Sequence, residues 1–223
     1  MDIKNFYTEK GDGFPLILLH GNAEDSGYFE HQVCEFSKYY KVFAIDTRGH
    51  GKTPRGDKPF TINQFALDLL NFMDEKNIEK AHILGFSDGG NIAIIFSILH
   101  PERVEKLILN GANLYPKGAT LKVRILDKTE YAFVSLFQSK NVLKKEMLEL
   151  MINQPNINPA ELAKIKSKTL VIAGTKDMIK KEHTEHIAKN IPNSELVFIK
   201  GDHFIAKKKF SEFNEKVLNF LKI

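Results

Sequence analysis

The stretch Gly85-Phe86-Ser87-Asp88-Gly89 decides the fold of this chain. The apolar run Ala81-His82-Ile83-Leu84 precedes it, and Gly90-Asn91-Ile92-Ala93-Ile94-Ile95-Phe96, which has helical spacing, follows it. Glycines on both sides of a serine, between a strand and a helix, predict a turn so tight that a flanking Cβ would clash with neighbouring backbone. Such a turn holds the serine in strained backbone space, with its hydroxyl at the positive end of the following helix. We therefore expect Ser87 to act as a nucleophile.

Strand-like and helix-like patterns alternate along most of the chain. Short apolar runs bounded by turn residues are typical of strands that are covered on both faces. Between them, apolar residues recur at helical spacing, as in Ile62, Phe65, Leu69, Phe72 and Met73. This alternation predicts an α/β fold with a mostly parallel sheet and helices on both faces. The predicted strands are residues 15–19, 41–45, 81–84, 106–109, 169–173 and 195–199.

Residues 113–165 interrupt this alternation, because they contain helical patterns over 121–137 and 141–152 but no strand run. The segment is too long for a simple loop. We therefore expect a small helical cap over the site, inserted into one core domain that comprises residues 1–112 and 166–223. Its apolar side chains Phe133 and Phe137 should be buried against the core or a substrate, which makes them candidate substrate-binding residues.

The composition indicates a soluble globular protein of ordinary type. The 223 residues suit one domain with a modest insertion, and apolar residues make up 43% of them. The net charge is +4, but residues of opposite charge are interspersed, so we expect neither a nucleic-acid nor a membrane partner. The single cysteine, Cys34, excludes an internal disulfide. Without a signal-like leader or an apolar run of ~20 residues, the chain is predicted to be cytoplasmic.

Two further residues complete a catalytic constellation with Ser87. Asp177 and His203 each follow a predicted strand, and the carboxyl ends of parallel strands meet at one edge of a sheet. We expect Ser87 to attack, His203 to act as general base and then as acid, and Asp177 to orient the imidazole. Asp202 is a weaker candidate for the orienting acid, because side chains of adjacent residues rarely face one another. Glu182 is weaker still, since it lies inside the next predicted helix.

An acyl-transfer site also needs two backbone N–H groups for the developing oxyanion, each worth ~3 kcal/mol of barrier. One would come from Asp88, which follows the nucleophile. The other would come from Asn22 in the loop His20-Gly21-Asn22-Ala23, where a glycine lets the backbone turn inward. These groups need no cofactor, and we expect none.

Two histidines, His183 and His186, have i, i+3 spacing and invite comparison with a metal site. The sequence offers no third ligand, and the neighbouring residues are charged. We therefore expect a surface helix here and no metal.

Several motifs together resemble the α/β-hydrolase superfamily: His20-Gly21, Asp46-Thr47-Arg48-Gly49-His50-Gly51, the serine turn, and the segments 174–177 and 201–203. The resemblance implies the order serine, acid, histidine along the chain. It also implies that Asp46, Arg48 and His50 have an architectural role. The first strands of that fold are barely visible, since only residues 3–8 could supply one, and the number of N-terminal strands stays open.

A narrower resemblance rests on Ser87-Asp88-Gly89-Gly90 and Leu109-Asn110-Gly111-Ala112-Asn113. These are similar to the biphenyl-hydrolase-like branch, which includes valacyclovirase-type hydrolases of α-amino-acid esters. The resemblance implies that the Asp88 carboxylate recognises a substrate ammonium group. A carboxylate beside an oxyanion repels it unless a cation offsets the charge. The alternative is that Asp88 only stabilises a helix N-terminus, where a carboxylate is favoured without any ligand.

The sequence therefore predicts a serine hydrolase that cleaves a small carboxylic ester through an acyl-enzyme, with α-amino-acid esters as candidate substrates. Amidase or peptidase, thioesterase and carbon–carbon bond hydrolase activities fit the same three residues. A homologue that binds a ligand without turnover is the alternative from another class. The physiological substrate and the oligomeric state stay open.

Overall fold

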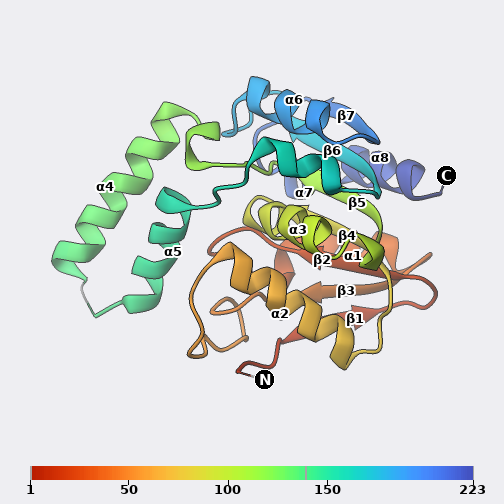
Figure 1. Ribbon diagram of the computed structural model, residues 1–223, viewed down its shortest axis with the longest axis horizontal. Helices are drawn as coiled ribbons and strands as arrows, with labels where there is room; N and C mark the ends of the chain where they lie inside the picture. Colours follow the sequence, from red (N-terminus) through yellow and green to blue (C-terminus); the bar gives the residue numbers. More distant parts are fainter. Residues whose placement is uncertain (1, 139, 223) are drawn as a thin grey trace.

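The computed structural model describes residues 2–138 and 140–222 (Figure 1). Within them a seven-stranded sheet has the order β1-β3-β2-β4-β5-β6-β7. All neighbouring strands are parallel except β1, which runs antiparallel to β3. The predicted α/β fold with a mostly parallel sheet is thereby confirmed. The strands are β1 Tyr7–Lys10, β2 Pro15–Leu19, β3 Lys41–Ile45, β4 Ala81–Phe86, β5 Val104–Asn110, β6 Lys168–Gly174 and β7 Ser194–Ile199.

Helices cover both faces of this sheet, as its central strands show. In β2, Ile17 and Leu19 pack into the cluster that includes α2, α3 and α6, whereas Leu16 and Leu18 pack against α1, α7 and α8. The alternation follows from the two-residue period of a strand. The covering helices are α1 Glu30–Phe36, α2 Ile62–Glu75, α3 Asp88–Leu99, α6 Lys181–Asn190, α7 Ile205–Lys208 and α8 Phe210–Lys222. Short 3₁₀ helices connect these layers: η1 Ser26–Phe29, η2 Pro101–Arg103, η3 Pro116–Gly118 and η4 Pro159–Lys164.

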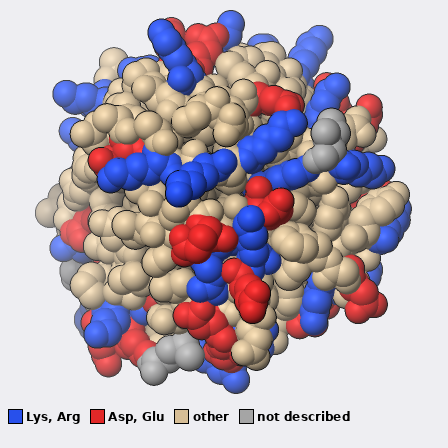
Figure 2. All heavy atoms as spheres, turned by 45° about the vertical axis from the view of Figure 1, so that its right-hand side comes forward, with Lys and Arg blue, Asp and Glu red and all other residues tan. Residues whose placement is uncertain are grey.

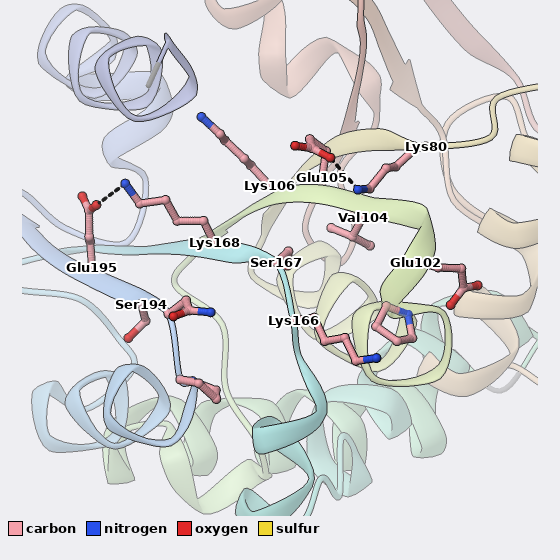
Figure 3. Close-up of a pocket in the computed structure, with 13 residues that line it drawn as sticks. Lys80, Glu102, Val104, Glu105, Lys106, Lys166, Ser167, Lys168, Ser194 and Glu195 are labelled. Carbon is pink, nitrogen blue, oxygen red and sulfur yellow. Dashed lines mark ion pairs between the residues drawn. The ribbon is translucent and has the colours of Figure 1, made fainter.

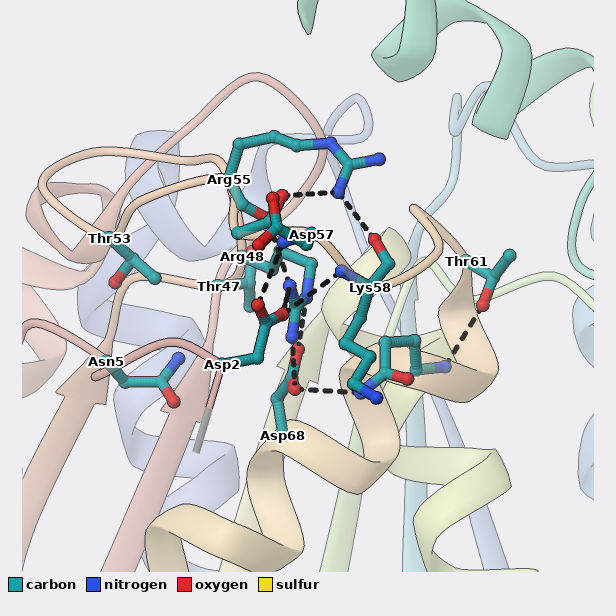
Figure 4. A network of polar contacts seen from close by, with 12 residues as sticks. Asp2, Asn5, Thr47, Arg48, Thr53, Arg55, Asp57, Lys58, Thr61 and Asp68 are labelled. Carbon is teal, nitrogen blue, oxygen red and sulfur yellow. Dashed lines mark hydrogen bonds and ion pairs between the residues drawn. The ribbon is translucent and has the colours of Figure 1, made fainter.

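The N-terminal segment is held by a polar network at the edge of the sheet (Figure 4). Arg48 is almost completely buried and donates two hydrogen bonds of 2.8 Å to the carboxylate of Asp68. It also donates to Asp2, which accepts from the backbone N–H groups of Asp57 and Lys58. The Asp57 N–H and the Arg48 guanidinium hold the pKa of Asp2 at about 2. The network places the residues before β1 across the turn that follows β3.

Residues 113–165, which we call the cap segment, lie between β5 and β6 and contain the helices α4 Leu121–Phe137 and α5 Val142–Asn153. Both helices stand to the left of the sheet in Figure 1, with α5 between α4 and the rest of the protein. Among the described residues of this segment, the β pairing is limited to one isolated bridge between Ala119 and Ile179. The division into a core domain and a cap stays a prediction. None of the described helices combines the length and apolar character that crossing a bilayer requires.

Two contacts anchor α5 to loops of the core. Arg55, in the turn after β3, donates to both carboxylate oxygens of Glu146 at 2.8 and 2.6 Å. Asn22, in the loop after β2, donates from Nδ2 to the backbone oxygen of Met147 at 3.1 Å. α5 is therefore tied directly to the loop that was predicted to supply an oxyanion donor.

Candidate active site

Ser87 lies at the turn between β4 and α3 with φ 53° and ψ −119°. This is a strained conformation for a residue with a side chain, and such strain is typical of functional sites. A Cβ on Gly85 would lie 2.2 Å from the Gly89 backbone oxygen, and a Cβ on Gly89 would lie 2.0 Å from that of Leu19. The two glycines are therefore required by close backbone approach. A hydrogen bond of 2.8 Å from the Ser87 N–H to the Asn110 oxygen fixes the turn against β5.

The acid and the histidine meet at the same edge of the sheet. Asp177 follows β6, His203 follows β7, and His203 Nδ1 lies 2.7 Å from Asp177 Oδ1. Both side chains are buried. The Ile179 N–H donates to the same Oδ1 at 2.9 Å, which fixes the orientation of the carboxylate. Because a carboxylate only accepts, the imidazole proton lies on Nδ1, and Nε2 is left as a base.

The imidazole lies beside the serine turn. The ring centroids of His203 and Phe86, the residue before Ser87, are 4.8 Å apart. On the other side, Gly111 at the end of β5 has φ +63°, and a Cβ there would lie 2.7 Å from His203 Cε1. The fold therefore brings all three residues of the predicted constellation to one place.

The weaker candidates for the orienting acid point elsewhere. Asp202 pairs with Lys208 and accepts from the Phe204 N–H at 2.9 Å. Glu182 is exposed on α6. Asp177 is therefore the carboxylate that His203 contacts.

The loop after β2 is held against the serine turn by a buried histidine. His20 accepts from the Thr47 N–H through Nε2 at 3.0 Å, so its other nitrogen donates to the Gly21 oxygen at 2.7 Å. Burial lowers the pKa of His20 and keeps the ring neutral. A Cβ on Gly21 would lie 3.1 Å from Ser87 Cβ, so a larger residue here would push the loop and the serine turn apart by a few tenths of an ångström.

The two predicted oxyanion donors are also linked through their side chains. The backbone N–H groups of Asn22 and Asp88 have no acceptor among the described residues. Asn22 Nδ2 donates to Asp88 Oδ2 at 3.0 Å, and Asn91 Nδ2 donates to Asp88 Oδ1 at the same distance. Burial raises the pKa of Asp88, against the effect of these amide donors. Asn22 Oδ1 is buried and without a partner in the described part of the chain. Sequence reasoning missed this link, since no local pattern reports a contact across 66 positions.

Glu24 is a second residue that sequence reasoning missed. Its Oε2 accepts from the Gly21 N–H at 3.3 Å. A Cβ on Gly21 would lie 3.1 Å from this oxygen and also 3.1 Å from Ser87 Cβ, so the carboxyl lies close to the serine turn. Burial raises the pKa of Glu24 to about 7, while the nearby His203 acts in the opposite direction. The buried hydroxyl of Tyr28 interacts electrostatically with this carboxyl and has no hydrogen-bond partner among the described residues. The position of Glu24, three residues after Gly21, is the sequence signal that could have identified this residue.

The two histidines lie on the surface helix α6, as expected, but His183 is on the inward face of that helix. His183 is buried, and its Nε2 accepts from the Leu114 N–H at 2.9 Å. Burial lowers its pKa to about 4, so the ring is neutral and structural. His186, one turn away, is only partly buried. The sequence did not indicate this inward face, because the residues around the two histidines are charged.

Phe133 and Phe137 pack on each other with ring centroids 5.1 Å apart and are not buried against the core. Their role in substrate binding stays a prediction.

The cavity in Figure 3 is not the candidate active site. It has a volume of about 780 Å³ and lies where β5, β6 and β7 begin, at the edge of the sheet opposite to Ser87. Two of its lysines are paired, Lys80 with Glu105 and Lys168 with Glu195. Basic and acidic side chains are mixed over the face shown in Figure 2, as the composition indicated.

Comparison with known proteins places this geometry in a family. The model of the α/β hydrolase fold family matches residues 15–143. The 2-hydroxy-6-oxo-6-(2'-aminophenyl)hexa-2,4-dienoic acid hydrolase of Metapseudomonas resinovorans is 34% identical over 114 residues, which cover 49% of this chain and 39% of that protein. The putative carbamate hydrolase RutD of Pseudomonas savastanoi is 25% identical over 245 residues, which cover 92% of this chain and 93% of that protein.

Among solved structures, an esterase from Exiguobacterium antarcticum superposes with a TM-score of 0.86 at 20% identity, over 99% of this chain and 96% of the other. This likeness concerns the fold alone. Together with the family match over residues 15–143, it leads to one conclusion: the chain belongs to the α/β-hydrolase family.

Proposed function

We propose that this protein is a serine hydrolase that cleaves a small carboxylic ester through an acyl-enzyme. The observation that carries the proposal is the 2.7 Å contact between His203 Nδ1 and Asp177 Oδ1, beside a serine in strained backbone. The similar proteins named above support hydrolysis as the reaction class. The acyl part of the substrate would lie at the carboxyl edge of the sheet, beneath the cap segment.

Each step follows from the arrangement of these groups. Ser87 Oγ attacks the ester carbon while His203 Nε2 takes its proton, and the N–H groups of Asn22 and Asp88 bind the oxyanion. His203 then gives the proton to the leaving alcohol, which leaves an acyl group on Ser87. Water, deprotonated by the same Nε2, attacks the acyl carbon, and Ser87 leaves as the alcohol with the proton returned.

Labelling with a fluorophosphonate probe tests the proposal directly. The wild-type protein should be labelled and the Ser87→Ala variant should not. Ser37→Ala is the matched control, because that hydroxyl is exposed and bonds only the Cys34 backbone oxygen among described residues. An unlabelled wild type, or equal labelling of Ser87→Ala, would defeat the proposal.

A carbon–carbon bond hydrolase is the second candidate, because the hydrolase from Metapseudomonas resinovorans is 34% identical over 114 residues. Measuring kcat/KM on four kinds of compound separates the reaction classes: short-chain p-nitrophenyl esters, a matched thioester, a matched anilide and the substrate named for that relative. We expect the highest kcat/KM on the esters. A homologue that only binds ligand would turn over none of these compounds above the buffer rate.

The preference for α-amino-acid esters depends on the Asp88 side chain. The buried oxygens of Asp88 and Asn22 form a group of acceptors that suits an ammonium, although two amides already donate to Asp88. Kinetics on matched esters with and without a free α-amino group measure the preference. If Asp88→Asn leaves it intact, the carboxylate has no part in it and serves the Asn22 link instead.

A further inference from the structure

The outer surface of α4 is an apolar face without a partner in the structure. Because successive residues of a helix are rotated by about 100°, six large apolar side chains gather in one band of about 160°. Thr129 and Ala132 lie within the same band. Each of the six side chains is more than half exposed, from Phe133 at 51% to Leu136 at 76%. The apolar face of α4 consists of Leu121, Ile125, Leu126, Phe133, Leu136 and Phe137.

This face points away from the rest of the protein. Asp127 lies on the opposite side of α4, where it lines a cavity together with Tyr115 and with Met151 of α5. Tyr131, also on the inner side, donates its hydroxyl hydrogen to Glu149 of α5 at 2.7 Å. A surface helix ordinarily buries its apolar stripe and exposes its polar one. In α4 the large apolar side chains are exposed instead, and the apolar face is uncovered by the described residues.

Unpaired positive charges surround this face. Lys122 lies within it, Lys128 borders it, and Lys140 follows the end of the helix. All three are exposed, and none forms an ion pair with another described residue. The acidic side chains nearby are already used, because Glu130 pairs with Lys144 at 2.9 Å and Glu146 pairs with Arg55. The charge that an approaching surface meets is therefore positive.

These observations distinguish between the two simplest partners. A second copy of the protein would form a two-fold symmetric interface, in which both copies use the same face of α4. Antiparallel pairing about Thr129 would bring the two copies of Lys128 to the same side of the interface, where they repel. An anionic bilayer instead offers a layer for the apolar side chains and phosphates for the lysines.

We propose that the apolar face of α4 docks this protein on the surface of an anionic lipid bilayer, with Lys122, Lys128 and Lys140 against the headgroups. The helix lies in the plane of the interface and does not span it. The inference goes beyond the proposed function, because docking requires no turnover. It differs from the expectation that the protein has no membrane partner, which rested on opposite charges interspersed along the sequence and on the lack of an apolar run long enough to span a bilayer.

Flotation with lipid vesicles tests this proposal, and the Ser87→Ala variant separates docking from catalysis. We expect both proteins to float with vesicles of phosphatidylcholine and phosphatidylglycerol, and to float less with phosphatidylcholine alone or at high salt. Leu136→Glu combined with Phe137→Glu should lower the vesicle partition coefficient by at least about tenfold, because two large side chains no longer insert. Each Lys→Glu change at the three positions should lower it by about fivefold.

The matched control is Leu99→Glu, because Leu99 is similarly exposed but lies at the end of α3. It should leave flotation unchanged. Failure of the wild type to float with either vesicle would overturn the proposal. A dimer in solution that the α4 changes convert to monomer, without vesicle binding, would assign the face to a second copy. A raised KM for a soluble ester in the α4 variants, without vesicle binding, would assign it to the substrate.

Discussion

The loops at the carboxyl edge of the sheet bury polar side chains, whereas helix α4 of the cap segment exposes apolar ones. At the sheet edge, polar groups such as His20, Arg48 and His203 are buried and hydrogen-bonded. On α4, large apolar groups such as Leu136 are exposed. We therefore expect the core to hold the reacting groups in place, and the cap segment to select a substrate or a surface.

This difference has a physical reason: more hydrogen bonds fix the position of each polar side chain in the core than fix the position of α5. A buried polar group must satisfy its hydrogen bonds, and each bond restricts it further. Asp46, for example, accepts from the N–H groups of Ser26 and Lys52 at 2.7 and 2.8 Å. By contrast, α5 reaches the polar core loops mainly through Glu146 and Met147.

The largest expected effect is in the core. Asp177→Asn should lower kcat for an ester by about 10⁴-fold, because the amide would favour the wrong imidazole tautomer. The fold should be kept, since the new side chain has the same shape. Steady-state kinetics with circular dichroism on the purified variant check both points.

Asp202→Asn is the matched control, since that carboxylate pairs with Lys208 and does not contact the imidazole through a hydrogen bond. Its kcat should stay within about twofold of the wild type, because an exposed pair contributes little. Equal losses in both variants would contradict the assignment of Asp177.

A smaller loss is expected from crowding the imidazole. Gly111→Ala places a methyl group 2.7 Å from His203 Cε1, at a position with φ +63°. Displacing the ring should lower kcat by about 10²-fold, since a shift of about 1 Å has that effect on a positioned base. Gly13→Ala shares the backbone strain, with φ +98°, but the nearest atom that its Cβ would meet is the Tyr39 backbone oxygen at 3.4 Å. This control should lose stability and keep its kcat; a matching loss of kcat would show that strain alone explains the effect.

Glu24 gives a prediction on stability and pH. Burial raises its pKa from 4.5 to about 7, so folding favours the neutral carboxyl. The stability that this provides is fully present below about pH 4.5 and is lost as the pH rises through 7. Between these values the wild type should lose about 1–2 kcal/mol more than Glu24→Gln, after allowance for partial solvent screening. Urea unfolding at several pH values measures the difference, and parallel pH profiles for the two proteins would contradict it.

The core was predictable from sequence because backbone constraints leave local signals. Glycines that flank Ser87 and apolar runs of strand length report close approach and burial directly, and β2 and β3 begin and end at the predicted residues. β1 was less visible because the edge strand Tyr7-Thr8-Glu9-Lys10 is mostly exposed and has no apolar run.

Long-range contacts left no such signal. His183 bonds a backbone N–H that is 69 positions away, so its burial cannot be read from the helix around it. The exposure of Phe133 and Phe137 was also unexpected, since apolar spacing shows which residues share a face but not where that face points. Sequence therefore predicted the arrangement of the core better than the orientation of the cap segment.

The smallest expected effect concerns the boundary between the two regions. Arg55 and Glu146 form a two-bond ion pair whose side chains are 29% and 22% exposed. A double-mutant cycle with Arg55→Met and Glu146→Gln should give a coupling of at most about 1 kcal/mol in the free energy of unfolding. KM for an ester should rise about two- to fivefold with kcat nearly unchanged, because α5 shifts while the reacting groups stay in place.

The pair Lys168–Glu195 is the control, since it is also an ion pair but lies where β6 and β7 begin. Removing it should change neither kinetic constant. If the Arg55 and Glu146 variants instead lose kcat at constant KM, the pair acts through Asn22, which donates to both Met147 and Asp88. In that case α5 acts as part of the catalytic core, and α4 is the part of the cap segment that we expect to select a substrate or a surface.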